Sequence, residues 1–291
     1  MKSAALIINP YSRKASKLRS RLEEALEAHG IVIVRQLSFA DSQTIEDFVN
    51  DLGTSIDCLI AAGGDGTLSS VAEVACHGKL PLGIVPLGTG NAFARDLRLP
   101  LDVEGAVETI ATGRVQLVDV AFANKSAFLN VVTSGLSSAI VDALDNRQKR
   151  IWGWIAYLLA LVRTSKTVKP FEITLTADGI VYKEFAWQLV VANGNWHGLG
   201  FQMHGDANVS DGYLHAYVVK SAAHRSKWHT LRSLWTGSQR QADEILALKA
   251  REFDIEFSRE RIVNIDGEQV QTKSLQVRLD PACLSVIVPP N

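Results

Sequence analysis

An apolar strand pattern that runs directly into a glycine-rich turn constrains this chain most. Residues 57–61 form the strand pattern, Gly63–Gly66 follow, and a helix pattern begins at Thr67. Glycine lets the backbone take positive φ and leaves no Cβ in the way of a ligand. The unpaired N–H groups at a helix start carry partial positive charge and suit a phosphate. We therefore expect a phosphate loop, in which Asp65 either pairs with a cation such as Mg²⁺ or accepts backbone N–H groups. It is not a Walker loop, because no Lys followed by Ser or Thr ends it.

A second glycine loop follows the next strand pattern, over residues 82–86. It contains Gly88, Thr89, Gly90 and Asn91, which combine a free backbone with hydroxyl and amide groups. The helix pattern over 67–77, which ends at Gly78, makes the crossover between the two strands. This arrangement places both loops at the carboxyl ends of neighbouring parallel strands, where open α/β sheets bind ligands. Either loop alone is also explained by an ordinary tight turn; the two in tandem favour a ligand site.

The first part of the chain alternates strand and helix patterns. The strand patterns at 4–8 and 31–37 are followed by amphipathic helix patterns at 18–26 and 45–52, and another helix pattern covers 103–111. Such alternation predicts a parallel, doubly wound sheet.

Strand patterns dominate from residue 115 onward. They cover residues 115–121, 127–132, 171–177, 184–192, 213–219, 253–257, 262–265 and 275–279. Asp178-Gly179 between two of them is a strong signal for a two-residue hairpin. Helix patterns interrupt the strands near 137–146, 151–163 and 224–235. We therefore expect a second lobe that is mainly antiparallel, with a ligand cleft between the lobes.

The amino-acid sequences of the two loops resemble those of the diacylglycerol kinase catalytic-domain family. This family includes bacterial soluble lipid kinases and the sphingosine and ceramide kinases. The matching segments span almost the whole chain in the right order: Asn9-Pro10, Gly63–Thr67, Pro86–Asn91, 198–201, 209–214 and 266–268. The Gly-Gly-Asp-Gly core alone is shared with NAD kinases and phosphofructokinases. The resemblance implies an N-terminal doubly wound α/β lobe and a C-terminal mainly antiparallel β-sandwich lobe. We place a nucleotide-binding α/β domain at 1–118 and a β-rich lipid-substrate domain at 119–291.

The resemblance also implies a set of site residues. The residues expected to bind ATP are Asn9, Pro10, Gly63, Gly64, Asp65, Gly66, Thr67, Leu68, Ser69, Gly88, Thr89 and Asn91. In the family the Asp-Gly-Glu segment faces the nucleotide loops, so Glu268 would accept the proton of a lipid hydroxyl while Asp266 assists or orients it. Read alone, Asp266-Gly267 is a plain hairpin turn. A positioned carboxylate can take such a proton, and the remaining catalysis is positioning and neutralisation of charge on the γ-phosphoryl group.

Two metal positions follow from the same comparison. Mg²⁺ would accompany ATP, with Asp65 as its carboxylate ligand and Asp119 as a plausible partner. Many relatives carry Asp after the Asn of the second loop, and this chain has Ala92, so one acidic group of the usual network is missing. A structural Mg²⁺ would be held by Asn208, Asp211 and the backbone carbonyl of Tyr213, which are oxygen ligands suited to a hard cation. The alternative is a turn in which Asp211 binds its own backbone.

Composition excludes some function classes. A net charge of −1 gives no basic footprint of a nucleic-acid binder. The three cysteines have no metal spacing, and we expect all three as small core residues in a reducing compartment: Cys58, Cys76 and Cys283. The N-terminus shows no signal-peptide pattern. The longest apolar run, 151–162, has 12 residues, whereas a span needs about 20.

The acceptor is expected to be a lipid. The segment 149–162 joins basic, aromatic and aliphatic residues and suits either a membrane interface or, as we favour, a buried helix of the second lobe. We expect a cytoplasmic protein with peripheral membrane contact and no nucleic-acid partner, and a homodimer stays open.

Three functions are consistent with the sequence. The first is an ATP-dependent lipid kinase acting on diacylglycerol or a related lipid. The second is a soluble kinase similar to NAD kinase, which Asn9-Pro10, the second loop and the Asp-Gly-Glu hairpin disfavour. The third is a non-catalytic nucleotide-binding regulator; Ala92 hints at it, and Glu268 argues against it.

Overall fold

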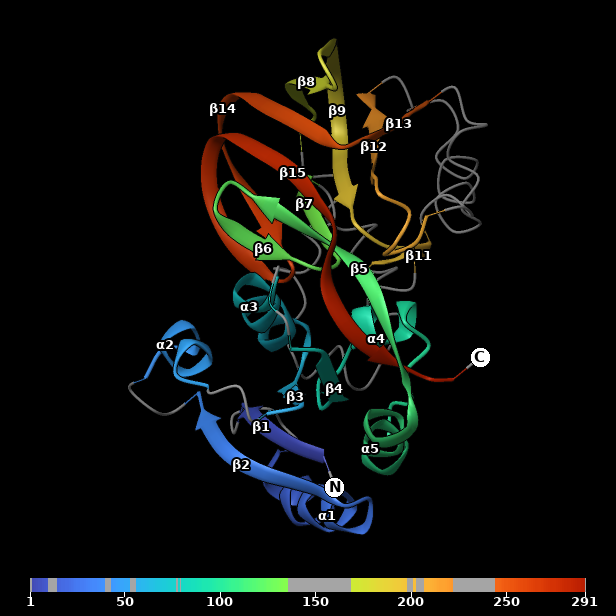
Figure 1. Cartoon of the computed structure of the whole chain (residues 1–291). Coiled ribbons are helices and arrows are strands. Elements are labelled where there is room, and N and C mark those ends of the chain that lie inside the picture. The colour runs from blue at the N-terminus through green and yellow to red at the C-terminus, as the bar shows by residue number, and fades with distance from the viewer. Residues whose placement is uncertain are drawn as a thin grey trace.

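The computed structural model of the 291-residue chain has an α/β part below a β-rich part in the view of Figure 1. It describes residues 2–9, 15–39, 43–52, 56–76, 78, 80–135, 169–197, 201–202, 207–221 and 244–290. The helix patterns near 137–146, 151–163 and 224–235 lie outside these residues, as do Pro10 and most of segment 198–201.

The N-terminal part is a parallel sheet with helices between its strands. The strands are β1 (Lys2–Ile8), β2 (Ile31–Ser38), β3 (Cys58–Gly63) and β4 (Leu82–Pro86), which lie in the order β4-β3-β1-β2. The helices are α1 (Ala15–Ala28), α2 (Ile45–Asn50), α3 (Asp65–Ala75), α4 (Ala92–Asp96) and α5 (Val103–Thr112). The expected alternation of strand and helix is therefore present.

Helices pack on both faces of this sheet. On one face, Phe48 of α2, Val71 of α3 and Phe93 of α4 are buried in one apolar core. On the other face, Leu22 of α1 and Val107 of α5 belong to a second core. Burial of these faces from water is the main stabilisation of such a layered fold, and it fixes the strand ends that carry the glycine loops.

The C-terminal part is β-rich. Its strands are β5 (Arg114–Ala123), β6 (Ser126–Phe128), β7 (Val131–Gly135), β8 (Phe171–Ala177), β9 (Ile180–Ala192), β10 (Trp196–His197), β11 (Phe201–Gln202), β12 (Leu214–Lys220), β13 (Ile245–Ala250), β14 (Glu252–Ile265) and β15 (Glu268–Val288). The pairings among β7, β8, β9, β12, β13 and β14 are antiparallel. The predicted hairpin between β8 and β9 is present, with positive φ at Asp178 and Gly179.

One long strand connects the two parts. β15 pairs with β14 at its start, and near its end Val286 pairs in parallel with Leu82 of β4. β5 runs antiparallel beside β15 over most of its length (Figure 1). The two parts therefore share a continuous sheet in the order β13-β12-β9-β7-β14-β15-β4-β3-β1-β2.

Three strand predictions differ from the structure in detail. The pattern at 127–132 is two strands, because the backbone N–H groups of Leu129 and Asn130 donate to the Asp266 carboxylate instead of a neighbouring strand. The patterns at 253–257 and 262–265 form one strand, β14, whose register shifts between Glu256 and Arg261. β13 was not predicted from the sequence.

The cysteine prediction is wrong for two of the three residues. Cys76 and Cys283 form a disulfide across 207 residues, with Cα atoms 5.1 Å apart. Cys76 ends α3, and Cys283 lies where β15 returns to the N-terminal part, a proximity that sequence spacing does not reveal. Cys58 is free and buried, as expected, and burial raises the pKa of its thiol to about 11.

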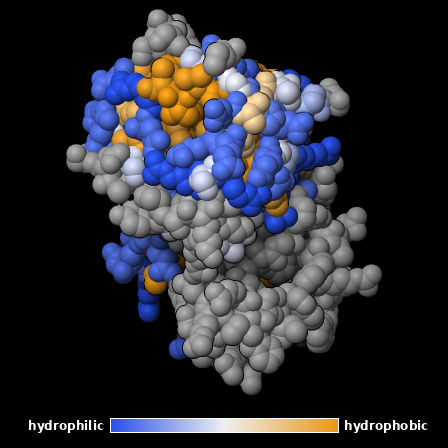
Figure 2. All heavy atoms as spheres, turned by 90° about the horizontal axis from the view of Figure 1, so that it is seen from below, coloured by the Kyte–Doolittle hydropathy of each residue, from blue (hydrophilic) through white to orange (hydrophobic). Residues whose placement is uncertain are grey.

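The edge strand β2 carries exposed apolar side chains. Val32 and Val34 of the edge strand β2 are 44% and 54% exposed. Seen from below, the molecule shows an apolar patch bordered by polar residues (Figure 2). None of the helices in the described residues is long and apolar enough to cross a bilayer.

Candidate active site between two glycine loops and a hairpin

The two glycine loops touch each other at the ends of β3 and β4. Gly63 pairs with Pro86, and the N–H of Leu87 donates to the carbonyl of Gly63 at 2.8 Å. A Cβ added at Gly88 would lie 2.7 Å from the Cα of Gly64, so the backbones are packed directly against one another. The tandem loops thus lie side by side, as the sequence predicts for neighbouring parallel strands.

Gly66 differs from these packed glycines. A Cβ built on it would have no neighbour within 4 Å, although the residue lies in the first turn of α3. Alanine is the better helix former at such a position. Packing within the protein therefore does not explain this glycine, whereas close approach of a ligand would.

The end of β1 reaches the same loops. The side-chain amide of Asn9 donates to the hydroxyl of Thr67 at 3.1 Å. Thr67, Leu68 and Ser69 are buried in the first turns of α3. The structure thus brings together the predicted nucleotide-binding residues that follow β1, β3 and β4. Pro10 lies outside the described residues.

Asn91 shapes the second loop. It has left-handed φ of 48°, and its amide nitrogen donates to the carbonyl of Gly88 at 3.2 Å. Its Oδ1 is buried and has no hydrogen-bond partner in the described part of the chain. Buried polar atoms are seldom left unpaired, so this acceptor fits a donor group on a bound molecule. Thr89 is exposed beside it.

Asp65 lies where α3 begins and contacts the second loop. Its Oδ1 accepts the N–H of Phe93 at 3.3 Å. Burial raises the pKa of this carboxyl, while the N–H groups at the start of α4, including that of Ala92, act in the opposite direction. Asp65 therefore caps α4 from another element, which is the second of the two roles expected for it. Mg²⁺ on a nucleotide commonly takes only one or two protein carboxylates besides phosphate and water, and Asp65 fits that requirement.

Asp266 fixes the β14–β15 hairpin against the nucleotide loops. Its carboxylate accepts the N–H groups of Leu129 at 2.7 Å and Val131 at 2.8 Å, and the hydroxyl of Ser69 at 2.8 Å. Burial raises the pKa of Asp266, and these hydrogen bonds oppose the rise. With so many donors, Asp266 acts as a positioning residue that ties the hairpin to α3.

Glu268 differs from Asp266 in its surroundings. It is exposed at the start of β15, directly after the hairpin turn, where Asp266 and Gly267 have positive φ. It pairs with Ile265 across the hairpin. The hairpin therefore holds one fully hydrogen-bonded carboxylate and, two residues on, an accessible one.

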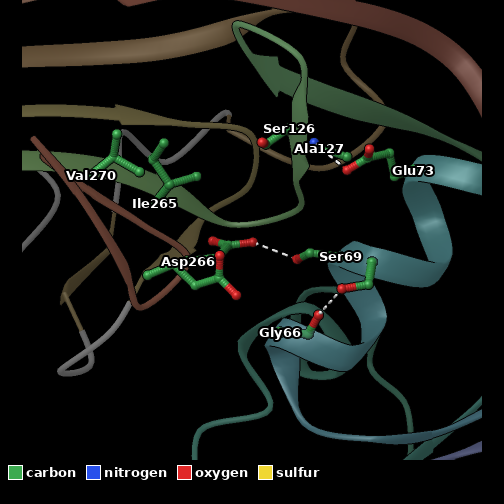
Figure 3. A pocket seen from close by; sticks show the side chains of 10 residues that line it. Gly66, Ser69, Glu73, Ser126, Ala127, Ile265, Asp266 and Val270 are labelled. Atoms are coloured by element: carbon green, nitrogen blue, oxygen red, sulfur yellow. Dashed lines mark hydrogen bonds between the residues drawn. The ribbon is translucent and has the colours of Figure 1, made fainter. Parts of the chain in front are cut away.

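A small pocket of about 120 Å³ lies beside this hairpin (Figure 3). Its lining comes from α3, β6 and the β14–β15 hairpin: Gly66, Ser69, Ser70, Glu73, Ser126, Ala127, Ile265, Asp266, Glu268 and Val270. Ser70, Glu73 and Ser126 were missed from the sequence. The α3 residues follow the i, i+3, i+4, i+7 spacing of one helix face, so this polar face could have been predicted from the sequence. The contact of that face with β6 could not.

Asp119, on β5, contacts the loop before β12. Its carboxylate accepts the N–H groups of Gly212 and Ala282, each at 2.8 Å. Burial raises its pKa, and the nearby charge of Asp211 adds to the rise. Its hydrogen bonds thus link Asp119 to the 208–213 segment and to β15. None of the described hydrogen bonds joins Asp119 to Asp65, its expected partner in holding Mg²⁺.

Two residues of the expected second metal site, Asp211 and Asn208, have hydrogen-bond partners within the protein. Asp211 contacts His215 Nε2 at 2.7 Å and Lys249 Nζ at 3.3 Å, and accepts the N–H of Tyr213 at 3.0 Å. Asn208 Oδ1 accepts the N–H of Ser210 at 2.9 Å. Burial acts to raise the pKa of Asp211, but His215, Tyr213 and Lys249 outweigh it and the net pKa is lowered.

The bond from the Tyr213 N–H to Asp211 is the one that the turn alternative requires. In the described part of the chain, no three His, Cys, Asp or Glu side chains are grouped so that they could hold a metal ion.

Comparison with known proteins agrees with this geometry. The family described as "Diacylglycerol kinase catalytic domain" matches residues 3–123, and the "YegS C-terminal NAD kinase beta sandwich-like domain" matches residues 130–288. This chain belongs to the diacylglycerol kinase family. The second match also supports a C-terminal part that resembles a β-sandwich.

Relatives span nearly the whole chain. A Klebsiella pneumoniae protein named "Probable lipid kinase YegS-like" is 26% identical and covers 99% of this chain and 97% of its own. A Staphylococcus epidermidis "Diacylglycerol kinase" is 26% identical, covering 92% and 86%. A Bacillus anthracis crystal structure described as "a putative diacylglycerol kinase" has 29% identity and a TM-score of 0.81, covering 99% and 96%. These relatives are named as kinases, in agreement with the site.

Proposed function

We propose that this member of the diacylglycerol kinase family is an ATP-dependent lipid kinase that phosphorylates the hydroxyl of diacylglycerol or a related lipid. The observation that carries the proposal is the direct contact of the two glycine loops beside the Asp266–Glu268 hairpin, which Ser69 fastens to α3. A phosphate-binding backbone and an accessible carboxylate are the two parts that such a transfer requires.

The reaction joins the lipid hydroxyl oxygen to the γ-phosphorus of ATP. The bond from that phosphorus to the β–γ bridging oxygen breaks, ADP leaves, and the hydroxyl proton passes to Glu268. Gly63–Thr67 and Gly88–Asn91 position the phosphates, with Asn9 supporting Thr67. Asp65 would hold Mg²⁺, which shields the phosphate charge when bound. Asp266 keeps the hairpin, and so Glu268, in place.

A lipid acceptor implies peripheral contact of this protein with a membrane surface, which we include in the proposal. The binding partner is then a lipid of the bilayer, which the protein reaches by binding reversibly to the membrane surface. The proposed reaction requires no other macromolecule.

A phosphotransfer assay tests the function. The protein is incubated with Mg²⁺, γ-labelled ATP and mixed micelles that hold diacylglycerol, phosphatidylglycerol, ceramide or sphingosine, with NAD in a parallel reaction. We expect label in a lipid product. Label on NAD alone would assign the protein to the NAD kinase-like function. ATP binding without any labelled product would favour the regulatory alternative.

A further inference from the structure

The pocket beside Glu268 has a composition that the phosphoryl donor does not explain. Three of its lining residues are carboxylates, Glu73, Asp266 and Glu268, and none of the described lining residues is Lys, Arg or His. Glu73 and Glu268 are exposed, and their charges repel an anion most at low ionic strength. The triphosphate of ATP is therefore a poor occupant of this pocket. The glycine loops, with their free N–H groups, are the better place for it.

The size of the pocket fits a small polar group. Liquid water takes about 30 Å³ per molecule, so a space of about 120 Å³ holds a group of roughly four heavy atoms. Serine hydroxyls of α3 and β6 supply polar contacts, while Ile265 and Val270 supply apolar ones. Val270 is 42% exposed and shares its strand face with Glu268, since side chains alternate along a strand. An acyl chain could continue from the pocket along this side.

Glu73 lies on the α3 wall of the pocket and faces β6 (Figure 3). Its Oε2 accepts the N–H of Ala127 at 3.1 Å, so the side chain is held across from the hairpin. Unlike Asp266, whose oxygens accept several donors, Glu73 has this one described hydrogen bond. Its position gives it a charge at the mouth of the pocket without a role in the transfer itself.

We propose that this pocket receives the hydroxyl-bearing headgroup of the lipid acceptor, and that Glu73 selects headgroups that carry no negative charge. This inference rests on the proposed lipid kinase function and extends it to the choice of acceptor. A neutral glycerol headgroup fits beside the carboxylates, whereas a phosphodiester placed there would be repelled. Glu73 is then a specificity-determining residue, distinct from the proton acceptor Glu268.

The test compares kcat/KM for diacylglycerol and phosphatidylglycerol in the same neutral-detergent micelles. The wild-type protein is expected to prefer diacylglycerol. Glu73→Gln keeps an oxygen for the Ala127 N–H but removes the charge, and is expected to reduce the preference by about three- to tenfold, the effect of one exposed charge. Raising the salt concentration should reduce the preference of the wild type more than that of the variant, because Asp266 and Glu268 still line the pocket of the variant.

Two further variants separate charge from structure. Glu73→Ala removes both the charge and the hydrogen bond, and should shift the ratio as Glu73→Gln does. Glu24→Gln on the exposed face of α1 is the matched control and should leave the ratio unchanged. A shift with Glu73→Ala alone would assign the effect to the Ala127 hydrogen bond and overturn the inference.

The remaining outcomes distinguish a failure of the headgroup selectivity from a failure of the proposed lipid kinase function. A wild-type protein that phosphorylates phosphatidylglycerol as well as diacylglycerol, or better, overturns the selectivity and leaves the lipid kinase standing. Absence of label in every lipid overturns both.

Discussion

At the scale of single residues, two carboxylates of one hairpin have different surroundings. Asp266 accepts backbone N–H groups from the 129–131 segment and the Ser69 hydroxyl, so its oxygens are occupied by the protein. Glu268 is exposed two residues later and faces the pocket. A base must be free to receive a proton within hydrogen-bond reach of the substrate. Glu268 meets that condition and Asp266 does not.

We therefore expect Glu268→Gln to keep ATP binding and to lower kcat for lipid phosphorylation by about 100- to 10,000-fold, the usual contribution of a general base. Nucleotide binding by calorimetry and turnover with labelled ATP measure the two effects. Glu256→Gln, an exposed position on β14, is the control and should behave as wild type. Full activity of the Glu268 variant would remove this residue from the mechanism.

At the scale of elements, the two glycine loops combine structural and ligand-facing glycines. Gly88→Ala would press a Cβ against the Gly64 backbone at 2.7 Å, so we expect a lower melting temperature, with a loss of about 1–3 kcal/mol of folding free energy. Gly66→Ala meets open space and should raise stability by up to about 1 kcal/mol, because alanine favours the helix.

The same two variants test the nucleotide site. Gly66→Ala is expected to weaken ATP binding although the fold is no less stable, because its methyl group would hinder the approach of the phosphates to the free N–H groups at the start of α3. Melting temperature and ATP affinity are measured on both proteins. Unchanged ATP affinity in Gly66→Ala would place the phosphates elsewhere.

At the same scale, we expect charged contacts to stabilise the 208–213 loop. Lys249 and His215 contact Asp211, one of the residues predicted from the sequence to hold a second metal ion. We expect EDTA to leave the melting temperature of the nucleotide-free protein unchanged and Lys249→Met to lower it by a few degrees. Lys183→Met, an exposed position on β9, is the control. A fall in melting temperature with EDTA, restored by Mg²⁺, would reinstate the metal.

The pH dependence of this loop follows from the lowered pKa of Asp211. A carboxyl with a lowered folded pKa contributes stability above its unfolded pKa of about 3.9, and loses it as the pH falls through the folded value. The gap in melting temperature between wild type and Asp211→Asn should therefore be full near pH 7 and should narrow in acid below about pH 3.9. A gap that persists through that range would mean that the charge of Asp211 is not what holds the loop.

The sequence predicted most elements but not their long-range contacts. Periodicity placed β1–β4, the helices between them and the β8–β9 hairpin, since these depend on local patterns. Their distinctive motifs made Asp65, Asp266 and Glu268 candidate site residues, and their roles stay predictions. Ser70, Glu73 and Ser126 were missed, since the pocket that they line forms only when α3 meets β6 and the hairpin. The return of β15 beside β4 has no local signal.

At the scale of the whole molecule, β15 closes the chain onto its first part. It starts at the candidate catalytic hairpin, pairs with β5, and ends beside β4. Cys283 on this strand is bonded to Cys76 at the end of α3, the helix that begins with the phosphate loop. The disulfide thus connects the C-terminal end of α3 to the strand that spans both parts of the molecule.

This bond predicts a redox-dependent stability. Closing a loop of 207 residues restricts the unfolded chain, and such bonds typically contribute roughly 2–4 kcal/mol. We expect purification without reductant to give one titratable thiol per denatured chain, that of Cys58, and reduction to give three. Reductant should lower the melting temperature of the wild type by several degrees and leave Cys76→Ser unaffected, because that variant cannot form the bond. Three thiols before reduction, with a melting temperature that reductant does not change, would show that the two cysteines stay apart in solution.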